Sequence, residues 1–155
     1  MITLQRILLP TDFSEHSQEA AAYACEFADR FESELHVLHV LQDIVALVPE
    51  PGLAFPPSGD YMQELKESAD QALLQIPGEE AAKGKSIVRT TLQGPPFVKI
   101  VRYAKEHDID LIVMGTHGRS GLAHVLMGSV AERVVRKAPC PVLTVRPSDH
   151  QFSMP

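Results

Sequence analysis

The sequence is poor in cysteine and in long apolar runs. Its 155 residues contain two cysteines, Cys25 and Cys140, which lie far apart in the chain. This spacing is neither a disulfide framework nor a zinc motif, and it suits a reducing compartment. No apolar run reaches about 18 residues and no signal-peptide pattern opens the chain. We therefore expect no membrane association and a cytoplasmic location.

Positive charge is also in short supply. Fourteen Lys and Arg stand against twenty Asp and Glu, which gives a net charge of −6. A general electrostatic grip on DNA or RNA needs a basic face, so we expect no nucleic-acid partner. Hydrophobic residues make up 45% of the chain and charged residues 22%, as in ordinary globular proteins.

Short apolar segments alternate with segments of helical periodicity along the whole chain. Strands are expected at 6–10, 34–41, 86–92, 109–114 and 142–145, and helices at 15–31, 61–83, 97–104 and 128–137. Pro77-Gly78 is expected to interrupt the second of these helices near its end. The alternation predicts an α/β three-layer sandwich, in which a five-stranded parallel sheet carries helices on both faces. Such Rossmann-like sheets bind ligands beyond the carboxyl ends of the strands, where the strand order reverses.

One domain over residues 1–147 accounts for this pattern. A proline-rich insertion at about 42–60 contains Pro49, Pro51, Pro56 and Pro57. Proline at this density opposes both helix and sheet, so the insertion is either a surface loop or a lid. Residues 148–155 form a loose C-terminal tail.

A glycine-rich stretch separates the fourth expected strand from the last expected helix. Gly115, Gly118 and Gly128, followed by Ser129, give the pattern G-x2-G-x9-G-[ST]. It is neither a Walker A loop nor the dinucleotide G-x-G-x-x-G. Glycines let the backbone approach a ligand, and the N–H groups at a helix N-terminus attract anions. Because strand–helix loops commonly span about 2–6 residues, this longer loop favours phosphate binding over a plain connection.

The glycine pattern closely resembles the nucleotide-binding signature of the universal stress protein family. The segments 7–14, 36–40 and 94–145 extend the resemblance over nearly the whole chain except the insertion and the tail. The resemblance implies a sheet in the order 3-2-1-4-5 and a homodimer through the last strand, Val142 to Val145. It also implies that the chain binds ATP, with Mg²⁺ held mainly by the phosphates.

The resemblance further assigns a set of ligand contacts. Asp12 would accept hydrogen bonds from ribose or adenine, although a turn-forming aspartate explains the same position. Ala131 stands where many ATP-binding members have threonine or serine, which implies weaker binding. The implied nucleotide contacts are Pro10, Thr11, Asp12, Val40, Met114, Gly115, His117, Gly118, Arg119, Gly128, Ser129 and Val130.

The histidines do not form an evident metal site. His36 and His39 are three apart on an expected strand, so their side chains point to opposite faces. His117 and His124 bracket the glycine loop, but no further zinc ligands can be identified. We therefore expect neither a protein-held metal nor a catalytic residue, and we expect Cys140 to be structural.

Three functions remain open at this point. The first is an ATP-binding, homodimeric stress-response module. The second is a slow ATPase or an enzyme that transfers a phosphate or adenylyl group. It would need a group that positions water, and Asp12, His117 and His124 show no partner for that task. The third is a dimerisation adaptor that works without nucleotide, because an apolar edge strand invites pairing.

Overall fold

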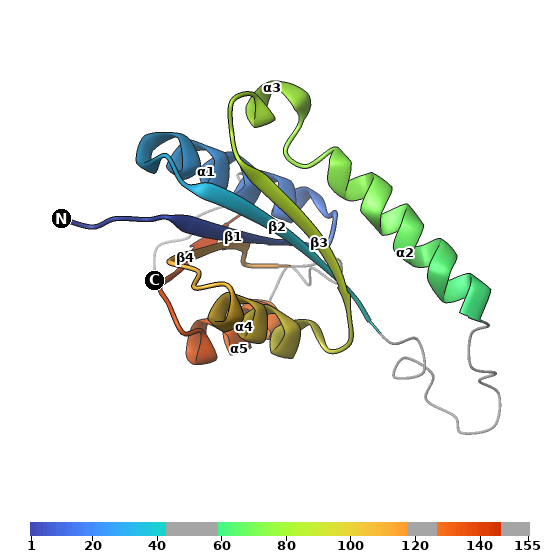
Figure 1. Cartoon of the computed structure of the whole chain (residues 1–155). Coiled ribbons are helices and arrows are strands. Elements are labelled where there is room, and N and C mark those ends of the chain that lie inside the picture. The colour runs from blue at the N-terminus through green and yellow to red at the C-terminus, as the bar shows by residue number, and fades with distance from the viewer. Residues whose placement is uncertain (43–58, 118–126, 147–155) are drawn as a thin grey trace.

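The computed structural model describes residues 1–42, 59–117 and 127–146. Within these ranges each strand is separated from the next by helix: two helices, α2 and α3, between β2 and β3, and one elsewhere (Figure 1). They are β1 (Arg6–Thr11), α1 (Glu15–Phe31), β2 (Glu34–Leu41), α2 (Gly59–Leu74), α3 (Glu79–Ala82), β3 (Ile87–Gln93), α4 (Pro96–Glu106), β4 (Leu111–Gly115), α5 (Ser129–Lys137) and β5 (Val142–Val145).

The five strands pair in parallel in the order β3-β2-β1-β4-β5, which confirms the predicted fold class and strand order. β1 pairs with β2 as far as Thr11↔His39, and with β4 at Ile7↔Leu111 and Leu8↔Ile112. The chain proceeds outward from β1 to β3 and then crosses to β4 on the other side. The order therefore reverses between β1 and β4, whose carboxyl ends flank the usual ligand crevice of such sheets.

Helices cover both faces of the sheet. α1 and α2 lie over one face, and α4 and α5 lie side by side over the other (Figure 1). Side chains alternate along a strand, so Ile7 and Leu9 of β1 pack in the α1 cluster while Leu8 packs in the α4/α5 cluster. The alanines along one side of α1, among them Ala20 and Ala24, are fully buried and allow this helix to approach the sheet closely.

Most expected boundaries lie within two residues of the observed ones. α1 begins after Ser14, whose hydroxyl accepts a hydrogen bond from Ser17 N at 3.3 Å, as its predicted N-cap role requires. The helix predicted over 61–83 is interrupted where its Pro77-Gly78 sequence predicted: α2 ends at Leu74 and the short α3 begins at Glu79. Pro77 lies between them, and proline lacks the amide hydrogen that a continuous helix would need.

Parts of the predicted domain division lie outside the described residues. These parts are 43–58 of the proline-rich insertion and the tail from 147 onward. None of the described helices combines the length and the apolar character that a membrane span requires.

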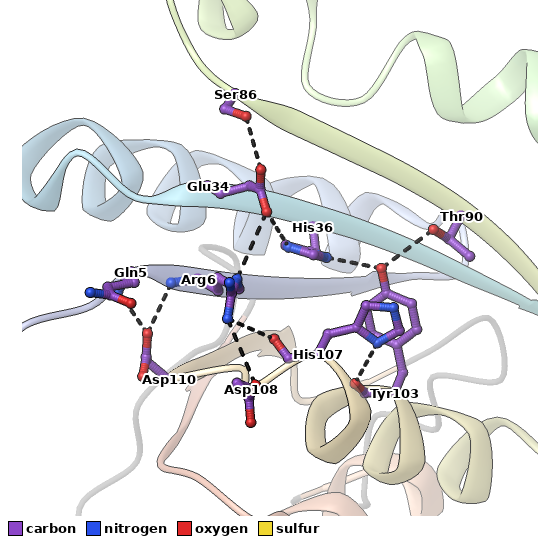
Figure 2. A network of polar contacts seen from close by, with 10 residues as sticks. All are labelled: Gln5, Arg6, Glu34, His36, Ser86, Thr90, Tyr103, His107, Asp108 and Asp110. Carbon is purple, nitrogen blue, oxygen red and sulfur yellow. Dashed lines mark hydrogen bonds and ion pairs between the residues drawn. The ribbon is translucent and has the colours of Figure 1, made fainter.

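A buried polar network connects β1, β2, β3 and α4 near the amino ends of the strands (Figure 2). His36 Nε2 lies 2.9 Å from Glu34 Oε1, and His36 Nδ1 lies 2.9 Å from the Tyr103 hydroxyl. Because a carboxylate only accepts, Nε2 carries the hydrogen of the neutral ring and Nδ1 accepts from Tyr103. Thr90 Oγ1 lies 3.4 Å from the same hydroxyl. The donors therefore run in one direction: Thr90 donates to Tyr103, Tyr103 to His36, and His36 to Glu34.

Burial decides the charge state of His36. Desolvation lowers the pKa of His36 below its ordinary value of 6.5, although its hydrogen bond to Glu34 acts in the opposite direction. Coulombic interactions with His107 and Arg6 lower the pKa of His36 further. The hydrogen bond from His36 in turn lowers the pKa of the Glu34 carboxyl.

This charge state predicts a loss of stability in mild acid. Below about pH 6.5 the unfolded chain binds a proton at His36 that the folded chain does not, so the free energy of unfolding falls as pH decreases from that value. Urea unfolding at a series of pH values, together with an NMR titration of the His36 ring, measures the effect. In His36→Gln the slope between pH 6.5 and 5 should be smaller. A His36 ring that titrates at or above 6.5 in the folded chain contradicts the prediction.

Candidate functional site

The turn after β1 is held by its own hydroxyl and carboxylate groups. Asp12 Oδ1 accepts from Ser14 N at 3.0 Å and from Ser14 Oγ at 2.5 Å. Thr11 Oγ1 accepts from Phe13 N at 3.1 Å and lies 3.0 Å from Ser17 Oγ. Since Ser17 Oγ donates to Ser14 O at 2.8 Å, the Thr11 hydroxyl is the donor to Ser17. Asp12 thus has the turn-forming role that the sequence left open, and its contact with a ligand stays a prediction.

Phe13 gives this turn an unusual backbone conformation. Its φ of 65° lies in the left-handed region, which aromatic residues rarely adopt. The Phe13 ring packs on the ring of His39 with centroids 4.3 Å apart, and His39 Nδ1 donates to Thr11 O at 2.8 Å. These contacts hold the strained residue in place and set the direction in which Asp12 leaves the sheet.

Gly115, the last residue of β4, lies directly against the first turn of α1. A Cβ atom at Gly115 would lie 2.9 Å from the backbone oxygen of His16. Backbone in a helix cannot move aside as a flexible side chain can, so this approach requires glycine. The rings of His16 and His117 also lie close, with centroids 6.0 Å apart.

Thr116 joins the two ends of the glycine-rich stretch. Its N–H donates to Val145 O at 2.9 Å, and its carbonyl accepts from Gly128 N at 2.7 Å. The second bond places the start of α5 beside the end of β4. Two glycine positions that are thirteen residues apart, Gly115 and Gly128, are therefore neighbours in space.

The start of α5 presents main-chain donors. The first hydrogen bond of the helix is Glu132 N to Gly128 O at 3.0 Å. The amides of Ser129, Val130 and Ala131 precede it and have no partner within the helix. No side chain of the described residues caps this end. The Gly128 amide itself is already bonded to Thr116, so it is not one of the available donors.

The structure brings most of the predicted contacts to one edge of the sheet. Pro10, Thr11 and Asp12 lie at the end of β1, Met114 and Gly115 at the end of β4, and Val40 near the end of β2. The side chains of Val40, Met114 and Val130 belong to the same hydrophobic cluster on the α4/α5 face. Of the other predicted residues, Gly118 and Arg119 lie outside the described residues, as does His124.

Comparison with known proteins decides the family. A family model described as the universal stress protein family matches residues 3–146. This chain belongs to the universal stress protein family.

Individual members of the family are similar along most of their length. A universal stress protein of Methanocaldococcus jannaschii, MJ0531, is 40% identical over 143 residues, which are 92% of this chain and 82% of that protein. The solved structure of MJ0577 from the same organism superposes with a TM-score of 0.82 at 31% identity and covers 96% of this chain and all of that one. A universal stress protein solved in complex with cAMP has a TM-score of 0.61 at 27% identity, with 93% and 98% of the two chains covered.

The sequence did not single out two residues that shape this family site. Thr116 is buried, its carbonyl accepts the Gly128 bond that closes the glycine-rich stretch, and its Oγ1 lies 3.0 Å from His117 Nδ1. His16 supplies the carbonyl against Gly115. Neither residue carries a periodicity or spacing signal, because both act through backbone atoms that any residue type supplies.

Neither cysteine has the lowered pKa that marks a reactive thiol. Burial raises the pKa of the Cys140 thiol, and it also raises the pKa of the Cys25 thiol against the opposing charge of Lys85. A raised pKa leaves little of the reactive thiolate. Within 1–42, 59–117 and 127–146, no three His, Cys, Asp or Glu residues are grouped as metal ligands would be.

The predicted opposite orientation of His36 and His39 is confirmed, because His36 bonds Tyr103 of α4 while His39 packs on Phe13.

The contact between β4 and α1 predicts the effect of Gly115→Ala. The added methyl group would press on the His16 carbonyl, so we expect the free energy of unfolding to fall by about 1–3 kcal/mol. Urea unfolding measures the change. Gly59→Ala is the matched control, because a Cβ atom there meets nothing within 4 Å. Equal unfolding midpoints for the two variants would show that the contact exerts no strain.

Proposed function

We propose that this universal stress protein binds ATP at the carboxyl ends of β1 and β4. The observation that carries the proposal is the Gly128–Thr116 hydrogen bond of 2.7 Å, which holds the amino end of α5 beside β4. The amides of Ser129, Val130 and Ala131, at the positive end of the helix dipole, would receive the phosphates. The Ser129 hydroxyl adds a further donor.

The base and sugar would occupy the neighbouring strand ends. The half-buried Asp12 carboxylate would accept from ribose or adenine, and the cluster of Val40, Met114 and Val130 would offer apolar contact. A relative at 27% identity was solved with cAMP, an adenine nucleotide, which supports this ligand class. Mg²⁺ would be held by the phosphates, because the described residues offer it no ligand cluster.

A charge placed at the amino end of α5 tests phosphate binding. Ser129→Asp adds a negative charge that favours the helix dipole, so the melting temperature should stay the same or rise. The same charge repels phosphates, and we expect the affinity for Mg-ATP to fall about tenfold or more, which is about 1.4 kcal/mol. Isothermal titration calorimetry measures both Mg-ATP and adenosine, and adenosine should bind Ser129→Asp and the parent chain alike.

Two controls accompany this experiment. Asp12→Asn keeps an acceptor for Ser14 and hence the turn, whereas Asp12→Ala removes it. Both variants should lose affinity for adenosine and for Mg-ATP, and only Asp12→Ala should also lose stability. Absence of Mg-ATP binding by the parent chain at millimolar nucleotide would end the proposal.

We propose further that the protein acts as a nucleotide-responsive homodimer in a cytoplasmic stress response. β5 is an outer strand of the described sheet, and Val142, Leu143 and Thr144 are only partly covered. Ile112 N donates to Pro141 O and Thr116 N to Val145 O, so β5 bonds to β4 through alternate residues. The backbone polar groups of Thr144 therefore point away from β4, toward the partner that would pair with this edge.

Thr144→Pro tests the edge. Proline removes an outward N–H group and spares the bonds to β4, so we expect a folded monomer. Thr144→Val keeps the N–H group and should stay dimeric. Light scattering with and without Mg-ATP gives the mass of each variant. A parent chain that is monomeric under both conditions would refute the dimer and leave the nucleotide site untouched.

A further inference from the structure

The two helices on one face of the sheet carry an excess of positive charge. α4 and α5 pack side by side, and their lysines and arginines define what we call the basic face (Figure 1). Two glutamates on the same helices, Glu106 and Glu132, leave a net charge of +4. The basic face consists of Lys99, Arg102, Lys105, Arg133, Arg136 and Lys137.

Most of this charge is not neutralised within the described chain. Arg136 pairs with Glu132 at 2.9 Å, one turn away on α5. The other five cations of the basic face form no ion pair with any residue of the described ranges. All six except the half-buried Lys99 are exposed. A cation without a nearby carboxylate remains available to an external anion.

The opposite face carries the opposite charge. α1, α2 and α3 hold ten carboxylates and two cations, Arg30 and Lys66, for a net charge of −8. We call these carboxylates the acidic face. They are Glu15, Glu19, Glu26, Asp29, Asp60, Glu64, Glu67, Asp70, Glu79 and Glu80.

The sheet keeps the two faces electrostatically separate. Helix layers pack about 10 Å from the layer beneath them, so the faces lie roughly 20 Å or more apart across the sheet. The Debye length at physiological ionic strength is about 8 Å, so each face is largely screened from the other. An approaching molecule therefore meets one sign of charge at close range, although the whole chain has a charge of −6.

We infer that the basic face docks against the acidic face of a second copy of this chain. Charge complementarity supports this occupant, because both partner surfaces are present on one molecule at equal concentration. Apolar side chains are exposed on both: Val98 and Val135 on the basic side, and Tyr23 and Phe31 on the acidic side. Arginine can also pack on exposed aromatic rings such as that of Tyr23.

Such a contact is heterologous, since each copy uses two different surfaces. Every added copy presents a free face of each sign, so association continues beyond two copies. The contact leaves the carboxyl edge of the sheet and β5 uncovered. The inference is therefore independent of the nucleotide site and of the proposed dimer.

Two other polyanions fit the basic face less well. Single-stranded nucleic acid binds through aromatic platforms for its bases, whereas Tyr103 of α4 is buried and Phe97 is half-buried. An anionic membrane surface favours large apolar anchors, and the exposed apolar residues of α4 and α5 are the two valines. A protein surface with carboxylates and small apolar contacts fits better.

Sedimentation velocity of the full chain tests the contact at two salt concentrations. At about 0.01 M salt the Debye length is about 30 Å, and at 1 M it is about 3 Å. We expect the weight-average mass to rise with protein concentration at low salt, by about twofold or more over the value at high salt. A mass that does not depend on salt overturns the inference.

Charge reversal on one face at a time makes the test specific. Arg102→Glu/Arg133→Glu lowers the net charge of α4 and α5 from +4 to zero, and Glu26→Lys/Glu64→Lys weakens the acidic helices from −8 to −4. Each pair shifts the net charge of −6 by four units, to −10 or to −2. Both variants should lose low-salt association when alone, and an equimolar mixture should regain it. If net repulsion governed association, the −2 variant would instead associate more strongly than the parent chain.

A conservative control and two probes complete the design. Arg102→Lys/Arg133→Lys keeps the charge and should associate as the parent chain does, and unchanged melting temperatures confirm folding of all variants. A dT oligonucleotide and phosphatidylserine vesicles are offered in parallel at low salt. Binding of either probe in place of self-association, lost in Arg102→Glu/Arg133→Glu, would reassign the face to nucleic acid or to membrane. Self-association that survives both reversals also refutes the inference.

Discussion

The hydrogen bond between Gly128 N and Thr116 O determines the shape of the candidate site. It closes the glycine-rich stretch at its base, so the first turn of α5 must lie beside the last residue of β4. Together with the burial of Ala131 and Val134 in the α4/α5 cluster, this bond holds the positive end of the helix dipole near β1 and Asp12. The site therefore depends on backbone geometry more than on any one side chain, as is common where main-chain amides meet an anion.

Charge is distributed over this molecule by layer. The two helices that follow β3 and β4 are basic, and the helices that precede β3 are acidic. The buried His36–Glu34–Tyr103 network lies between β2 and α4 and is neutral at His36 because burial lowers the pKa of that imidazole. The ends of the sheet thus differ in kind: one holds a closed polar network, and the other presents amides that have no partner within α5.

The sequence predicted the fold well, because apolar strands and amphipathic helices alternate and each pattern has one simple solution. β2 and β5 begin and end where they were expected. The interruption of the second helix at Pro77 was predictable too, because proline lacks the amide hydrogen that a continuous helix needs. The net charge did not reveal the two charged faces, because it does not say where in the structure the charges lie. The family resemblance implied the ligand contacts. The roles of the Thr116 and His16 carbonyls could not be predicted, because every residue type has a backbone carbonyl.

The absence of a Cβ atom at Gly115 affects how far β4 and the turn after β1 can move independently. Because β4 touches the His16 carbonyl there, the turn that carries Asp12 and the strand that leads into the glycine-rich stretch behave as one rigid unit. Neither can shift without displacing the other. A ligand that bridges these two described elements would find them already in contact, and little of its affinity would be spent on bringing them together.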